Sequence, residues 1–222
     1  MKKNFLQKTI CLFIAFVMLA VSFTFPAAAE ENPRFSDVSE DHWAYDYIYE
    51  CSSRGIINGY PDGTFKPEKQ LQACEFIKMV CCAYAKKEFR ESYIKDLNLP
   101  SDSHWARPYV IGWGGTFFHA EDYETDESLE ETITRFEAAY MIVCMYLRLN
   151  YDNEEKNNPD GAEEYIKNIK DADLIEREFD RITVGTAIKY GLINGFDDGT
   201  FRPYDGLTRA QAAKIIYLAL TN

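Results

Sequence analysis

The chain has 222 residues and an acidic balance, with 36 Asp and Glu against 24 Lys and Arg, which gives a formal net charge of −12 at pH 7. Nucleic acid and anionic membrane surfaces are therefore disfavoured as partners, because the field of the whole protein would repel them. A negatively charged ligand could bind only where local donors overcome that field.

The first 29 residues have the pattern of a secretory signal peptide. A basic start (MKK) precedes an apolar run that ends near Phe25, and Ala27, Ala28 and Ala29 provide a cleavage site. The run is short for a bilayer span. We predict export and cleavage after Ala29, with an uncleaved anchor as the alternative, and no membrane contact for the remaining chain. Three of the 24 basic residues lie in this segment, so residues 30–222 would carry 21 basic and 36 acidic side chains, a net charge of −15.

Cysteines in the exported part are odd in number, and none forms a Cys-x-x-Cys pair. The spacing of seven between Cys74 and Cys81 places both on one helical face, which favours buried thiols. A disulfide is the alternative, and zinc binding is less favoured still. The five residues are Cys51, Cys74, Cys81, Cys82 and Cys144.

One stretch occurs twice and indicates how the fold is built. GIINGYPDGTFKP at residues 55–67 returns as GLINGFDDGTFRP at residues 191–203, 136 positions later. Such self-similarity at a fixed spacing indicates one supersecondary unit used several times. Gly55 and Gly191 suit the left-handed residue that ends a helix, and the Asn-Gly and Asp-Gly pairs suit tight turns. We predict a rigid loop between two helices, pinned by its aromatic residues.

The first two predicted repeats share one plan. In residues 30–90, a helix is predicted over about 42–54, and a second over about 72–87 with Ile77, Val80 and Tyr84 as its buried stripe. In residues 91–150 the plan recurs 62 positions later, with HWA at 104–106 matching HWA at 42–44. The connector at 117–132 is acidic and lacks both turn pairs, so we interpret it as diverged.

Residues 151–167 interrupt the plan with an acidic insert, in which we predict residues 151–161 to be a solvated linker. The third repeat, residues 168–222, restores the loop and ends in a helix that starts near Leu207 and buries Ala213, Ile216 and Leu220. The repeats together predict an all-α fold, with the three second helices in a central bundle and a pseudo-threefold arrangement. This plan leaves no residues for a separate catalytic domain, so we predict that the protein is not an enzyme.

Two second helices begin with a capping box, in which Thr134 pairs with Glu137 and Thr208 with Gln211. Capping does not explain the residue that follows each threonine, Arg135 or Arg209, because a cation in the first turn opposes the helix dipole. We infer that each guanidinium and helix end bind an anion together, as planar recognition of a carboxylate would require. The alternative is that a neighbouring aspartate is the only partner of each arginine.

Other candidate residues have ordinary structural explanations. Trp43 and Trp105 could stack on sugars, although core packing or a groove wall is favoured by their helical context. The acidic loops around Asp62 and Asp198 lack the ligand spacing of a calcium loop, so we interpret them as turns. We find no nucleophile elbow, zinc-helix motif or phosphate loop in the sequence.

The ordered motifs FxDV, HWA, GIINGYPDGTFxP and [IL]TRx[EQ] resemble the S-layer homology (SLH) repeat, and three copies cover nearly all of residues 30–222. The resemblance implies a three-pronged helical domain that docks exported proteins non-covalently on the bacterial cell wall. It also implies the ligand: a secondary cell wall polysaccharide that carries a pyruvate ketal, whose carboxylate lies in grooves between the prongs.

Site residues follow from the resemblance by position. Arg135 and Arg209 would be the main ligand contacts. The first repeat has Ala73 in the arginine position, and the third has Phe179 for the tryptophan, so at most two grooves should keep an arginine and the groove of Ala73 should be inactive or altered. The remaining groove candidates are Asp37, Asp96, Asp171, Trp43, Trp105, Gly59 and Gly195.

We therefore predict a secreted protein at the cell surface of a Gram-positive-type bacterium, bound to an anionic wall polysaccharide, with no cofactor and no metal. A scaffold that binds a protein partner through its grooves or acidic surface is the main alternative, and a glycosidase that uses an acid pair is a third. Replacing Arg135 or Arg209 by alanine should weaken wall binding and leave the melting temperature nearly unchanged.

Overall fold

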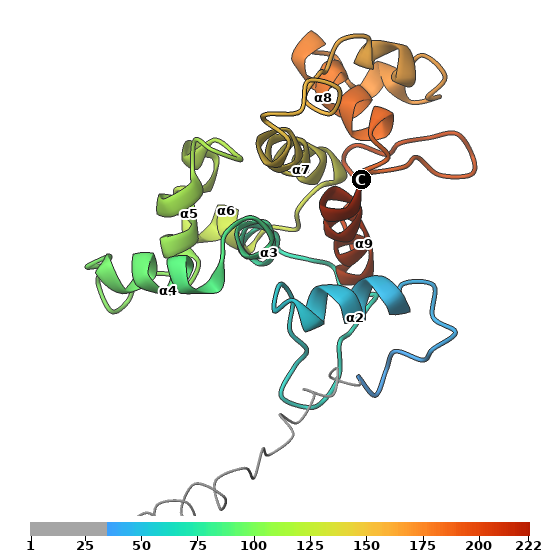
Figure 1. Ribbon diagram of the computed structural model, residues 1–222. Helices are drawn as coiled ribbons and strands as arrows, with labels where there is room; N and C mark the ends of the chain where they lie inside the picture. The colour runs from blue at the N-terminus through green and yellow to red at the C-terminus, as the bar shows by residue number, and fades with distance from the viewer. Residues whose placement is uncertain (1–34) are drawn as a thin grey trace, which may run out of the picture. The chain divides into compact units, whose positions relative to one another are not determined.

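The computed structural model describes residues 35–222, and the predicted signal peptide lies outside them. Within this part the fold is all-α, as predicted, because strand pairing is limited to isolated bridges. None of the described helices is long and apolar enough to cross a membrane. The α-helices, shown in Figure 1, are α2 (Tyr45–Ser53), α3 (Ala73–Tyr84), α4 (Lys87–Asp96), α5 (Arg107–Trp113), α6 (Asp126–Glu130), α7 (Arg135–Leu149), α8 (Glu178–Lys189) and α9 (Arg209–Thr221). Three short 3-10 helices are η1 (Ala120–Tyr123), η2 (Ala162–Ile166) and η3 (Ala172–Leu174).

Helices α3, α7 and α9, the second helices of the three repeats, pack against one another at the centre (Figure 1). The predicted stripes are buried in part. Ile77 and Ile216 are fully buried, whereas Tyr84 and Leu220 are half-buried. The chain segments that lead into these helices are joined in a closed ring, because Leu71 donates its N–H to Leu207 O (2.8 Å), Leu207 to Ile133 O (3.1 Å) and Ile133 to Leu71 O (3.0 Å). A pseudo-threefold relation between whole repeats stays a prediction.

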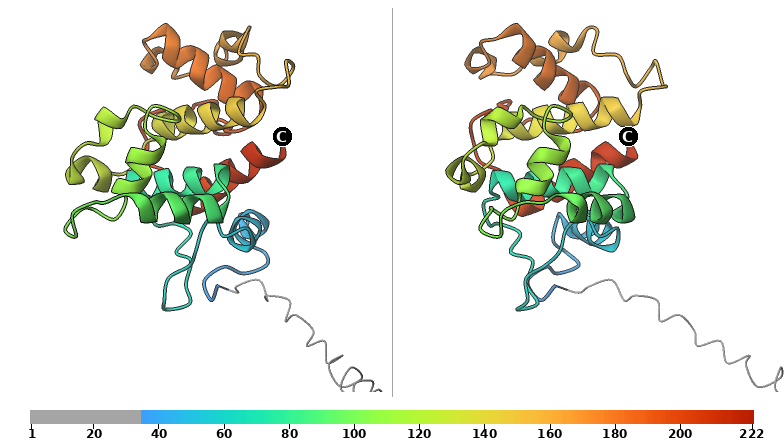
Figure 2. Two further views of the ribbon diagram at one scale, coloured as in Figure 1. Left: turned by 60° about the vertical axis from the view of Figure 1, so that its left-hand side comes forward. Right: turned by 90° about the vertical axis from the view of Figure 1, so that its left-hand side faces the viewer.

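The first helix of each repeat packs on the second helix of the repeat before it. Helix α5 contacts α3, α8 contacts α7, and α2 of the first repeat contacts α9 of the third (Figures 1 and 2). Each repeat therefore completes its neighbour's core. This exchange explains why a single unit could not bury its own apolar face and why the three must fold together.

The two glycine-rich loops have the turn chemistry that the sequence predicts. Gly55 and Gly191 have positive φ angles of 66° and 64° directly after α2 and α8. In the second turn, Asp62 Oδ1 accepts hydrogen bonds from the N–H (3.0 Å) and hydroxyl (2.5 Å) of Thr64, and Asp198 makes the same pair with Thr200. These bonds lower the pKa of both carboxyls. No cluster of metal-ligating side chains occurs in the described part of the chain.

In the insert at 151–167, the predicted linker of residues 151–161 is mostly exposed, whereas the segment that follows it packs on the core. Its helix η2 packs against α8, where Ile166 is fully buried. Gly185 makes this close approach possible, because a Cβ atom there would lie 2.1 Å from the carbonyl oxygen of Ala162. Lys189 Nζ donates to Asn158 O at 2.7 Å and to Asp160 O at 3.0 Å. The polar composition of the insert is thus satisfied by α8 rather than by solvent alone.

The second repeat differs from the prediction in two helices. Helix α4 lies between the predicted second helix of the first repeat and the HWA motif at 104–106, and α6 lies in the diverged connector. The cysteines are free thiols in the described residues, as favoured from the sequence. Burial raises the pKa of Cys51 to about 12 and that of Cys74 to about 11, so both are neutral core residues.

Candidate functional site

Two clefts of equivalent composition lie between the repeats. The first groove, about 280 Å³, is bounded by the glycine-rich loop of the first repeat and by the start of α3. Each of the other two repeats adds one side chain, so that this groove needs all three. Its lining consists of residues 56–60, Glu75, Lys78, Met79, Trp105 and Arg209.

The second groove, about 170 Å³, has the same plan one step around the ring. The loop of the third repeat and α9 form its floor, Arg135 comes from the second repeat, and Trp43 comes from the first. Much of its lining lies 136 positions after the matching residues of the first groove, namely residues 192–196, Gln211, Lys214 and Ile215. Two separate parts of the sequence therefore build one kind of site twice.

Arg209 enters the first groove from the start of α9, where its side chain is only 7% exposed. Its Nε donates to Phe65 O at 2.9 Å, and its Nη2 donates to Asn58 O at 2.8 Å. The guanidinium lies over the rings of Tyr60 and Phe65, at 4.9 Å and 4.6 Å from their centroids. Nη1 lies 3.7 Å from Glu75 Oε1.

Arg135 repeats this arrangement in the second groove at 5% exposure. Its Nε donates to Phe201 O at 2.8 Å and its Nη2 to Asn194 O at 2.9 Å, with the ring of Phe196 4.6 Å away. Burial lowers the pKa of Arg135 to about 10, so the side chain remains a cation at neutral pH.

These contacts change the role predicted for the two arginines. Their main partners are neither an anion at the helix end nor an aspartate, but carbonyl oxygens of the glycine-rich loop of another repeat. Each guanidinium therefore fixes a loop to a helix across a repeat boundary. We now expect alanine substitution to lower stability, because Phe65 O and Phe201 O belong to fully buried residues and would lose their donors.

The loops present backbone donors beside each guanidinium. Among the described residues, the N–H groups of Asn58 and Gly59 have no hydrogen-bond partner, and the same is true of Asn194 and Gly195. Neighbouring N–H groups without a partner are able to donate hydrogen bonds to an oxyanion. Gly59 is required by packing, because a Cβ atom there would lie 2.3 Å from the ring of Phe35. The predicted residues Gly59 and Gly195 thus lie in the grooves as backbone rather than side-chain groups.

The tryptophans form groove walls. His42 Nδ1 accepts the N–H of Ala44 at 3.1 Å and so fixes the turn before α2, which leaves Trp43 53% exposed over the second groove. His104 does the same for Ala106 at 3.2 Å, and Trp105 is 50% exposed over the first groove. Exposed indole faces beside polar donors are suited to the apolar face of a sugar ring.

The three predicted aspartates are not groove residues. Asp37 accepts the N–H groups of Phe65 and Lys66, both at 2.7 Å, and Asp171 binds Phe201 and Arg202 in the same way. Lys66 and Arg202 have positive φ angles of 57° and 56°, so each aspartate stabilises a turn that a non-glycine residue disfavours. Asp96 is exposed at the end of α4, where the diverged connector offers it no such loop.

Sequence reasoning missed Lys78 and Lys214. Each lies one turn after the capping residue Glu75 or Gln211, on the groove side of its helix. The 136-residue offset that relates them could have identified them. In the first groove, the lysine, the arginine and Glu75 give the lining a formal charge of +1. In the second groove, the lysine and the arginine give +2. Both grooves are therefore cationic in a protein whose net charge is strongly negative.

Comparison with known proteins identifies the repeats. The family model of the S-layer homology domain matches residues 34–71 and 168–213. The chain is 28% identical over 206 residues to an amylopullulanase of Thermoanaerobacterium thermosulfurigenes, covering 89% of this chain and 10% of that protein. It is 30% identical over 100 residues to a cellulosome-anchoring protein of Acetivibrio thermocellus, covering 41% and 22%.

A third relative is the outer membrane protein SlpA of Deinococcus radiodurans, which is 40% identical over 75 residues, covering 34% of this chain and 6% of that protein. The chain thus spans only a minor part of each relative, and the catalytic names among them describe proteins that are mostly unmatched. The resemblance seen in the motifs is confirmed for the first and third repeats, because the model of the S-layer homology domain matches residues in both.

Proposed function

We propose that this protein attaches to the bacterial cell surface by binding an anionic wall polysaccharide in the first and second grooves. The observation that carries the proposal is the repeated donor set: a guanidinium, a lysine and two free backbone N–H groups beside an exposed tryptophan. Such a set appears twice with the same geometry although the surrounding sequence is acidic.

The chemistry of the donors favours a carboxylate next to a sugar ring. Charge-assisted hydrogen bonds from a guanidinium and from backbone N–H groups are the stronger kind and suit a planar anion. Each arginine keeps donors beyond the two that bind loop carbonyls, since a guanidinium has five N–H groups. The pyruvate ketal of a wall polysaccharide supplies both the carboxylate and the ring, and is our proposed ligand.

The comparisons support surface attachment as the role. One relative is named for anchoring, and another is an outer membrane protein. The enzymes among the relatives share only a small part of their length with this chain, which favours a binding module over a catalytic one. We propose accordingly that the chain is not an enzyme and acts after export.

Purified cell walls test the proposal. Wild-type protein should sediment with walls, and should be lost from walls that have been treated with acid to strip pyruvate and wall glycans. Trp43→Ala and Lys214→Ala alter the second groove without touching the loop–arginine contacts, so they should weaken binding at an unchanged fold. Undiminished binding to stripped walls would favour a protein partner instead. Turnover of labelled glycan that a single carboxylate change abolishes would favour the enzyme.

A further inference from the structure

A third groove, about 250 Å³, occupies the remaining place in the ring, between the second and third repeats. Glu137 and Tyr140 of α7 line it, 62 positions after Glu75 and Lys78 of the first groove. The arginine position is held by Ala73, whose N–H donates to Glu131 O at 2.8 Å, as the N–H of an arginine does in the other two grooves. This backbone hydrogen bond is therefore kept, although the guanidinium is absent.

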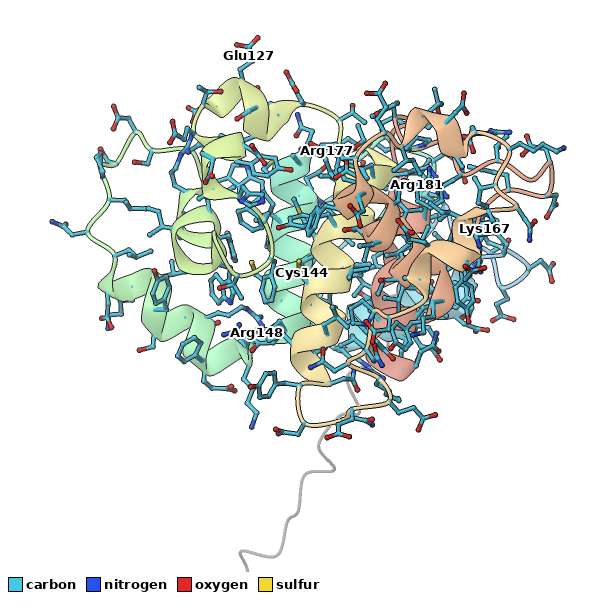
Figure 3. The ribbon with its side chains drawn as sticks, turned by 90° about the horizontal axis from the view of Figure 1, so that it is seen from above. Glu127, Cys144, Arg148, Lys167, Arg177 and Arg181 are labelled. Carbon is cyan, nitrogen blue, oxygen red and sulfur yellow. The ribbon has the colours of Figure 1, made fainter. Side chains whose placement is uncertain are left out.

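The charge of the lining is reversed in the third groove. Its lining contains three carboxylates, from Asp122, Glu137 and Asp180, and one cation, Arg177. The formal charge is therefore −2, where the first and second grooves have +1 and +2. Figure 3 shows Arg177 at the start of α8, on the side turned toward the second repeat. An anionic ligand is disfavoured here, because like charges at close range repel.

The carboxylates of this groove have acceptor capacity to spare. Asp180 Oδ2 accepts from Arg177 Nε at 2.8 Å, whereas Asp180 Oδ1 is buried with no partner among the described residues. A buried polar atom without a partner costs about 1–3 kcal/mol, so a donor supplied by a ligand would be favourable. Glu137 is only weakly engaged on its groove side, by the hydroxyl of Tyr123 at 3.4 Å.

Aromatic rings form the other wall. Phe179, which replaces the tryptophan, is 58% exposed and meets Tyr140 edge-on at 5.9 Å between centroids. Tyr140 in turn is stacked on His119 at 5.7 Å with an interplanar angle of 10°. A flat apolar surface beside carboxylates suits a ring that carries a positive charge, since a cation is attracted both to the carboxylates and to the aromatic faces.

We propose that the third groove binds an amino sugar whose amine is free and protonated, and so recognises a second kind of residue in the wall glycan. That the ligand is part of a wall glycan rests on the proposed function. The binding of a cation in the third groove does not, because it involves other residues and the opposite ligand charge. The ammonium would lie between Asp180 and Asp122, and the sugar ring would lie on Phe179. One protein would then bind anionic and cationic residues of a polysaccharide in separate grooves.

The test uses the whole exported protein, a β-1,4-linked glucosamine disaccharide and its N,N′-diacetyl form, which lacks the charge. Calorimetry should detect binding of the free amine form only, and NMR amide shifts should fall at residues 118–123 and 177–180. Asp180→Asn and Asp122→Asn should each lower the affinity about tenfold, the loss of one charge-assisted hydrogen bond. Arg177→Gln should raise it, because a competing cation is removed.

Matched controls separate this site from non-specific attraction to an acidic protein. Glu127 lies at the outer end of α6, away from the groove (Figure 3), so Glu127→Gln changes the charge equally and should leave the affinity unchanged. An equal loss in that variant, or equal binding of the diacetyl form, would overturn the proposal. Nα-acetyl-lysine amide carries a free ammonium but no sugar ring. Equal binding of this compound would show that the sugar ring is not recognised and would also overturn the proposal.

A pyruvylated glycan gives a further outcome. If it shifts the same amides and its binding is lost in Arg177→Gln, the third groove would be a third anion site, which would also overturn the proposal. Binding of that glycan at the first and second grooves is scored on the same samples, so failure of one proposal is distinguishable from failure of the other.

Discussion

Replacing Arg209 by alanine should destabilise the folded protein markedly. The change removes the donors for Phe65 O and Asn58 O. Asn58 is exposed, so water can replace its donor, but Phe65 is fully buried and its carbonyl would remain unsatisfied. That penalty is about 1–3 kcal/mol, and the lost stacking on the loop rings adds to it. A total of roughly 2–3 kcal/mol corresponds to a fall in melting temperature of about 5–10 °C for a chain of this size.

Differential scanning calorimetry of the wild type and two further variants measures this effect. Arg54→Ala is the control, since Arg54 forms an ion pair with Glu50 at a side-chain exposure of 43% and such pairs contribute about 1 kcal/mol or less. Arg209→Lys keeps the charge but not the planar fork, so it should stay close to alanine. A melting temperature for Arg209→Ala within about 2 °C of that for Arg54→Ala would refute the loop-fixing role.

Three further predictions concern the first groove, the turn at Asp198 and the buried thiols. Glu75→Gln gives the first groove the capping residue and charge of the second, and should tighten its binding of an anionic glycan about fivefold in calorimetry, since a unit charge at about 4 Å is worth about 1 kcal/mol in water. Asp198→Asn should lower the melting temperature near neutral pH and make its decrease in acid less steep. Folding lowers the pKa of this carboxyl, so the ionised group stabilises the protein above the ordinary pKa of 3.8. This contribution is lost as the pH falls through the lowered pKa of the folded protein. Alkylation of Cys51 and Cys74 at about pH 8 should be slow until the protein unfolds, because burial raises the pKa of both thiols.

Each of these has a clear contrary result. Weaker or unchanged binding in Glu75→Gln would mean that the carboxylate itself contacts the ligand. An acid transition in Asp198→Asn as steep as that of the wild type would assign acid sensitivity to other groups. Alkylation of the native protein at the rate of an unfolded peptide, followed by mass spectrometry, would contradict the buried state of the thiols.

Much of the fold could be predicted because its signals are local. Periodicity placed α3 and α9, and the left-handed glycines Gly55 and Gly191 placed the ends of α2 and α8. Helix α4 was missed because none of its residues is fully buried, so no apolar period marks it. The packing of η2 against α8 could not be predicted, because it depends on Gly185 of α8, a small residue whose role is visible only when another backbone lies against it.

The arginines, tryptophans and loop glycines of the site were predicted, but the roles of the arginines were not. The offset between repeats identified Arg135 and Arg209, yet their partners are carbonyl groups, which carry no sequence signature. Asp37 was taken for a ligand contact because its motif is shared by the family, whereas its bonds to a loop 28 residues away are visible only in three dimensions. The third groove could be anticipated as altered, but its acidic lining comes from three separate segments.

The central claim is that the first and second grooves recognise a carboxylate on a wall sugar. Calorimetric titration of the exported protein with a wall glycan, before and after enzymatic or mild acid removal of its pyruvate, tests this most directly. We predict two sites for the pyruvylated glycan, one of them lost in Trp43→Ala, and at least tenfold weaker binding once pyruvate is removed. Equal affinity for the two glycans would contradict the account.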